Sequence, residues 1–72
     1  MALLDGTVMH YDAKLDMGKI KSHGFEEKDY NFGRMHWQSK EYPPKRGLIV
    51  EFDPAGTVAT KILVVGFSST IS

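Results

Sequence analysis

Apolar residues in this chain alternate with polar ones over short stretches, and nowhere do they recur at helical spacing through three turns. Alternation with a period of two is typical of strands that bury one face. Charged and turn-forming residues separate the alternating stretches. The pattern predicts an all-β chain with five strands, over residues 6–11, 17–21, 30–33, 47–52 and 57–65.

The connections between these strands favour a barrel. Polar residues at 12–16 and 23–29 join the first three strands into a meander, and residues 53–56 (DPAG) predict a turn between the last two. Residues 34–46 have no period and contain a Pro-Pro pair, which indicates a long loop. Because 72 residues cannot supply the seven strands of a sandwich, we expect a five-stranded Greek-key barrel with this long loop between strands 3 and 4.

The composition limits the kinds of site that this single small domain can hold. The chain has no cysteine, and its three histidines lie 13 residues apart, at positions 10, 23 and 36. This spacing does not resemble that of zinc ligands, and disulfides are excluded. We find no pairing of a nucleophile with a base and no glycine-rich phosphate loop. We therefore expect no metal, no cofactor and no enzymatic activity.

Charge and hydropathy point to a soluble protein. Nine basic and nine acidic side chains cancel, which argues against binding nucleic acid by net charge alone. The longest apolar run, residues 62–65, is far shorter than the roughly 18 residues that span a bilayer, and the amino terminus lacks the features of a signal peptide. We expect a cytoplasmic barrel over residues 1–66, followed at 67–72 by a flexible tail or the start of a linker.

Several short motifs lie in the order and spacing of a known family. Six residues of the first hairpin match G-x-V-K-W-F-N followed by K-G-F-G-F-I, namely Gly6, Val8, Tyr11, Asp12, Gly18 and Ile20. Residues 29–34 (DYNFGR) are similar to D-V-F-V-H-F, and residues 46–52 (RGLIVEF) are similar to E-G-x-x-V-x-F. Over residues 5–65 the chain thus resembles the cold-shock domain, a five-stranded oligonucleotide-binding (OB) barrel.

Other residues resemble a divergent bacterial branch of this family. They are the Tyr30-x-Phe32 pair, Trp37 and the Pro43-Pro44 pair. The resemblance to this branch implies a bacterial protein, and the resemblance to the cold-shock domain implies one that binds single-stranded RNA or DNA.

The chain departs from the family where bases are bound. The outward aromatic residues of cold-shock domains stack on unpaired bases, and each stacked base contributes about 1–3 kcal/mol. The matching positions here hold mostly non-aromatic residues, which are His10, Met17, Lys19, Asn31, Gly33 and Arg34. Only Tyr11 keeps an aromatic ring, so tight binding by the family's mechanism is not expected.

Strand alternation predicts which residues share each face of the sheet. The residues expected to point inward are Val8, Gly18, Ile20, Tyr30 and Phe32. Those expected on the outer face are Met9, Tyr11, Met17, Lys19, Lys21 and Asn31. With the basic and aromatic start of the long loop, this face predicts a nucleic-acid site formed by Tyr11, Lys19, Lys21, Arg34, His36 and Trp37.

Two interpretations of this surface remain open. In the first, it binds single-stranded RNA or DNA weakly and with little sequence preference, with Trp37 as part of a stacking platform. As the plain alternative to such a site, the outer face is merely solvated and Trp37 is a lid on the core. In the second interpretation, the barrel is a protein-interaction or self-association module that has lost the stacking platform. Zero net charge and the apolar end at residues 62–67 favour the second. An accessory domain tethered to a larger partner is a further alternative.

Overall fold

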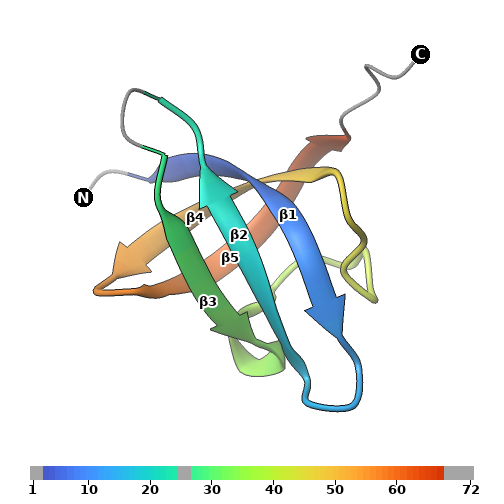
Figure 1. Cartoon of the computed structure of the whole chain (residues 1–72). Coiled ribbons are helices and arrows are strands. Elements are labelled where there is room, and N and C mark those ends of the chain that lie inside the picture. Colours follow the sequence, from blue (N-terminus) through green and yellow to red (C-terminus); the bar gives the residue numbers. More distant parts are fainter. Residues whose placement is uncertain (1–2, 25–26, 68–72) are drawn as a thin grey trace.

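A computed structural model describes residues 3–24 and 27–67. Its strands are β1 (Leu4–Asp12), β2 (Met17–Ser22), β3 (Asp29–Gly33), β4 (Leu48–Ala55) and β5 (Val58–Phe67), with one short 3-10 helix, η1 (Arg34–His36). The strands close into a barrel in the order β1-β2-β3-β5-β4 (Figure 1). The prediction of an all-β, five-stranded OB-like barrel, with a long loop between β3 and β4, is confirmed.

The last strand extends slightly further than expected. β5 runs through Phe67, one residue beyond the predicted end of the barrel, and residues 68–72 of the expected tail lie outside the described residues. Within the described ranges, no helix is long and apolar enough to cross a membrane.

The barrel interior is filled by side chains from every strand and from the long loop. The buried core consists of Val8, Ile20, Tyr30, Phe32, Trp37, Leu48, Val50, Phe52, Ala59 and Ile62. All five residues that alternation predicts to point inward are buried, Gly18 included. Burial of alternate residues leaves one face of the β1–β2–β3 meander outside the core.

A β-bulge interrupts the alternation in β1. Val8 pairs with Ile20, but the next pair is His10 with Lys19, so Met9 is an extra residue in β1. A bulge of this kind moves every later side chain of the strand to the opposite face. His10 therefore shares the outer face with Lys19.

The same bulge turns Tyr11 toward the barrel interior. Tyr11 pairs with Gly18, and a Cβ built on Gly18 points at the Phe32 ring. Directly opposed residues share a face of the sheet. Tyr11 accordingly packs against the core, half-buried. The expectation that Tyr11 lies on the outer face is wrong, because the bulge cannot be seen in the alternation.

The turn between β4 and β5 is shorter than predicted. β4 continues through Ala55, which pairs with Val58, so only Gly56 and Thr57 form the turn. Gly56 has a φ of 66°, in the left-handed region that two-residue hairpin turns require. The prediction of a turn over residues 53–56 is therefore wrong in position, because this tight turn lets the ladder extend into that segment.

The long loop is anchored to the barrel by Trp37. Its ring is 8% exposed and stacks on Phe32, with centroids 5.6 Å apart and planes 28° apart. The indole Nε1–H donates to the carbonyl of Glu41 at 2.7 Å, and the next backbone amide, of Gln38, donates to the carbonyl of Ile62 at 2.9 Å. Of the two interpretations of Trp37, the lid on the core is confirmed.

Candidate nucleic-acid interface

The strand register places polar side chains of three strands in one row on the outer face. His10 pairs with Lys19, and Lys19 pairs with Asn31. Lys21 lies two residues further along β2, on the same face as Lys19. An imidazole, two ammonium groups and an amide are thus gathered on the sheet that forms the front of the barrel in Figure 1.

Two shallow hollows lie on this face, one on each side of Met17. Each has a volume of about 220 Å³, and Met17 and Asn31 line both. His10 and Lys19 line the first hollow together with the acidic Asp12, whereas His36 lines the second. The Met17 side chain, which is 50% exposed, is thus shared by the two hollows. Each hollow is large enough for one planar ring.

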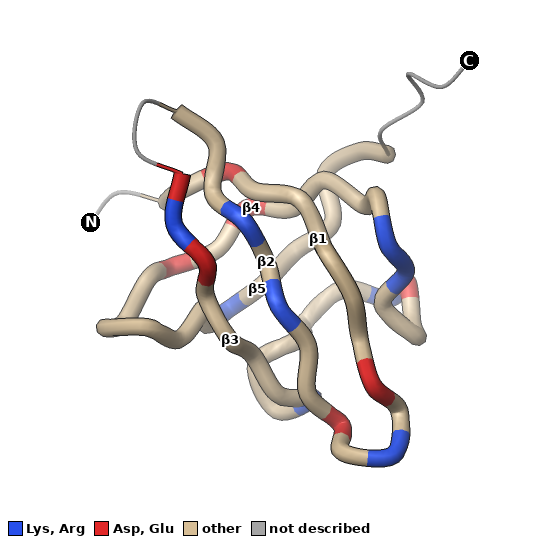
Figure 2. Tube along the Cα trace, viewed as in Figure 1, with Lys and Arg blue, Asp and Glu red and all other residues tan. Residues whose placement is uncertain are grey.

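The positive charge on this face is local. Figure 2 shows the two lysines of β2 as successive blue segments along the strand. Asp29 of β3 lies directly opposite Lys21 in the register, which reduces the net positive charge at that end. The face can contact a few phosphates but does not form an extended basic surface.

Tyr11 and Arg34 are engaged elsewhere, at the end of the barrel. The Tyr11 ring stacks on Phe32 with centroids 6.0 Å apart, and its hydroxyl donates to the Asp16 carboxylate. The Tyr42 hydroxyl lies 3.0 Å from that of Tyr11, and the Arg34 guanidinium lies 4.9 Å from the centroid of the Tyr42 ring. These contacts hold the first hairpin loop against the long loop.

The hydrogen bond to Asp16, with a smaller contribution from Tyr42, raises the pKa of Tyr11 above its ordinary value. Below the usual tyrosine pKa of about 10, the phenol is protonated in both folded and unfolded chains, and its contribution to stability is complete. Above that pH the unfolded chain ionises first. We expect the free energy of unfolding to fall more steeply above about pH 10 in the parent than in Tyr11→Phe, as measured by urea titration. Equal slopes for the two proteins would contradict this assignment.

The structure divides the six predicted binding residues into two sets. Lys19 and Lys21 lie on the outer face, and His36 lines one of its hollows. Tyr11, Arg34 and Trp37 instead contact other side chains of the chain, as described above, and line neither hollow.

Three residues absent from the predicted site lie at the centre of the face. They are His10, Met17 and Asn31. A signal for them was present in the sequence, because they occupy positions at which the resemblance places base-stacking aromatic residues. They were not included in the predicted site because they do not carry the aromatic rings that the family has at these positions.

Neither a scan against models of protein families nor a search of curated proteins matched this chain. The resemblance to cold-shock domains therefore rests on the motifs quoted above. Within residues 3–24 and 27–67, no group of three or more histidine or acidic side chains is placed to hold a metal ion.

Proposed function

We propose that this protein binds single-stranded RNA or DNA weakly, and with little sequence preference, on the outer face of β1, β2 and β3. The observation that supports this most directly is the row of His10, Lys19 and Asn31 beside the two hollows that flank Met17. OB barrels in general bind oligonucleotides on the face of their second and third strands. The proposal includes the cold-shock ancestry that the sequence motifs imply and the cytoplasmic location expected of a chain without cysteine.

In the proposed mechanism, Lys19 and Lys21 contact phosphates while two successive bases occupy the hollows. Met17 separates the two bases, and the imidazoles of His10 and His36 provide flat surfaces on either side. Stacking of this kind tolerates any base, because every base has a π face. Asn31 donates to or accepts from a base edge in either hollow. The expected affinity is low, because these residues replace a platform of larger aromatic rings.

The proposed contacts predict a shallow salt dependence. For single strands, the logarithm of the binding constant falls with the logarithm of salt concentration with a slope of about −0.7 per neutralised phosphate. Two to four phosphates therefore correspond to a slope between about −1.4 and −2.8.

Charge reversal on β2 tests the proposal. Replacing Lys19 and Lys21 together by glutamate is expected to weaken binding of a labelled single-stranded oligonucleotide roughly tenfold or more at low salt, and to reduce the slope by about 1.4. The measurement is fluorescence anisotropy with RNA and with DNA, at low and at physiological salt. Both side chains lie outside the core, so the barrel is expected to stay folded.

The matched control reverses Lys40 and Lys61, two exposed lysines that line neither hollow. This control makes the same change in net charge and is expected to bind much more tightly than the β2 variant. If both variants lose affinity equally, binding responds to net charge alone and the face is not the site. If the parent does not bind at all, the proposed function fails.

A further inference from the structure

Two of the three histidines of this chain line the hollows of the proposed binding face. His10 lies on β1 and lines the first hollow, and His36 lies on η1 and lines the second. The His10 side chain is exposed and that of His36 is half-buried, so both are accessible to solvent. Histidine is the side chain whose ordinary pKa, about 6.5, lies closest to neutral pH. Both hollows therefore hold a group whose charge changes near neutral pH.

Charges of both signs surround His10. Lys19 lies directly opposite on β2, and Asp12 of the same strand lines the same hollow. On the other side of β1, the long loop bonds to this strand just after Lys45 and Arg46. Protonation of His10 thus adds a second positive charge to a hollow that already has one ammonium group and one carboxylate.

The surroundings of His36 are almost free of charge. Within the described chain, no charged side chain lines its hollow. η1 packs against β3 and β5, whose charged residues are Asp29 and Lys61. Arg34, on η1 itself, has its guanidinium over the Tyr42 ring. Protonation of His36 therefore gives this hollow its first positive charge.

The third histidine lies near the other end of the same sheet and lines neither hollow. His23 Nε2 lies 2.6 Å from the hydroxyl of Thr7, which pairs with Lys21, and the His23 amide donates to the carbonyl of Asp5. A hydroxyl can donate to the neutral ring or accept from the protonated one, so the pair suits both charge states. His23 is therefore a matched control for the other two histidines.

We propose that protonation of His10 and His36 regulates oligonucleotide binding on this face, so that affinity rises as the pH falls from about 8 to about 5.5. This inference rests on the proposed function. A phosphate near either ring stabilises the imidazolium, which has a positive charge and two N–H donors, more than the neutral imidazole. The complex then holds protons more tightly than the free protein does. By linkage, the protonated protein binds the oligonucleotide more tightly.

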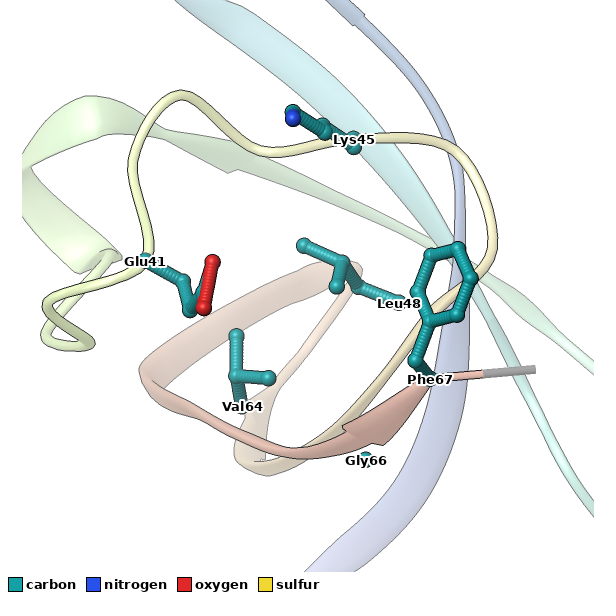
Figure 3. A pocket seen from close by; sticks show the side chains of 6 residues that line it. All are labelled: Glu41, Lys45, Leu48, Val64, Gly66 and Phe67. Atoms are coloured by element: carbon teal, nitrogen blue, oxygen red, sulfur yellow. The ribbon is translucent and has the colours of Figure 1, made fainter. Parts of the chain in front are cut away.

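A larger pocket elsewhere on the barrel lacks such a group. Figure 3 shows this pocket, about 420 Å³ in volume, between the long loop and the end of β5. Its charged lining residues are Glu41 and Lys45, and the described chain places no histidine among the others. Glutamate and lysine ordinarily keep their charges between about pH 5.5 and about pH 8. The pH response thus distinguishes binding on the β1–β2–β3 face from binding in this pocket.

The experiment measures binding of rhodamine-labelled oligouridine by fluorescence anisotropy at about pH 8 and about pH 5.5, at constant salt. Uracil and the phosphodiester backbone do not titrate in this range, and the oligonucleotide carries no terminal phosphate. A surface contact between unit charges contributes roughly fourfold to fivefold to a binding constant. With two histidines, the parent is expected to bind roughly fifteenfold more tightly at the lower pH.

Single substitutions separate the hollows from the rest of the face. His10→Gln and His36→Gln are each expected to reduce the gain to roughly fourfold, and the double variant is expected to bind almost equally at both pH values. His23→Gln makes the same change outside the hollows and is expected to keep the gain of the parent. Circular dichroism at both pH values establishes that each variant is folded.

Three results would overturn the inference. A parent that binds equally at both pH values would remove the regulation and leave the proposed function standing. A double variant that keeps the parent's gain would place the proton uptake elsewhere. A loss of gain in His23→Gln as large as in His10→Gln would mean that binding responds to net charge rather than to the hollows. If the parent binds at neither pH, the proposed function itself fails, and this inference fails with it.

Discussion

Replacing Phe32 by alanine is expected to leave most of the protein unfolded at 25 °C. Phe32 is 1% exposed, and its ring stacks on the rings of both Tyr11 and Trp37. Truncation of a buried phenylalanine costs about 3–5 kcal/mol through lost apolar burial and the cavity left behind. A core of this size rarely supplies more than about 3–5 kcal/mol in total, so the loss is comparable to the whole stability.

Urea denaturation followed by circular dichroism and by fluorescence measures this effect. The chain has a single tryptophan, so its emission reports directly on the packing around Phe32. Met35→Ala is the control, because Met35 is apolar and 82% exposed, and its truncation is expected to change stability by less than about 0.5 kcal/mol. A cooperative Phe32→Ala transition near that of the parent would show that the aromatic stack does not support the barrel.

Gly18→Ala is expected to have the second largest effect. A Cβ at this position would lie 2.5 Å from the Phe32 ring and 2.6 Å from the backbone carbonyl oxygen of His10. The backbone of β1 cannot move away without breaking its pairing with β2. Overpacking in a filled core typically costs about 1–3 kcal/mol, and we expect a value at or above the upper end of that range.

Gly33→Ala is the matched control for this substitution. Gly33 has a φ of −116° and a ψ of 174°, an extended conformation that alanine adopts freely. The nearest atom to a Cβ there is the carbonyl oxygen of Asp16, at 3.6 Å. The control is expected to be neutral, or stabilised by about 0.4–1 kcal/mol through the lower entropy of its unfolded chain. Equal midpoints for the two variants in urea would contradict the close approach of β1, β2 and Phe32.

Much of the fold could be predicted from local patterns. The positions of five strands, the meander and the long loop follow from alternation and from turn residues, each of which needs only neighbouring positions in the chain. The inward direction of Ile20 and Phe32 follows in the same way, since β2 and β3 pair without a bulge. The register of β4 with β5 across the Gly56 turn was less predictable, because a short turn and a longer one both suit the sequence there.

The candidate site was harder to predict than the fold. Lys19 and Lys21 lie on the outer face as alternation requires. Tyr11 does not, because the extra residue at Met9 reverses the side chains that follow it, and a bulge depends on how two strands pair. The direction of Trp37 was equally undetermined, since a lone tryptophan in a loop suits either a stacking platform or a core.

The sequence by itself thus determined an all-β chain, its five strands and the mixed polar and apolar character of the outer face, because these depend on the order of side chains along each strand. Only the tertiary structure decided that Tyr11 and Trp37 stack on Phe32 in the interior and that His10 joins Lys19 and Asn31 outside. The physical reason is that bulges and ring stacking are set by contacts between segments distant in the chain, and no local pattern records which segments will meet.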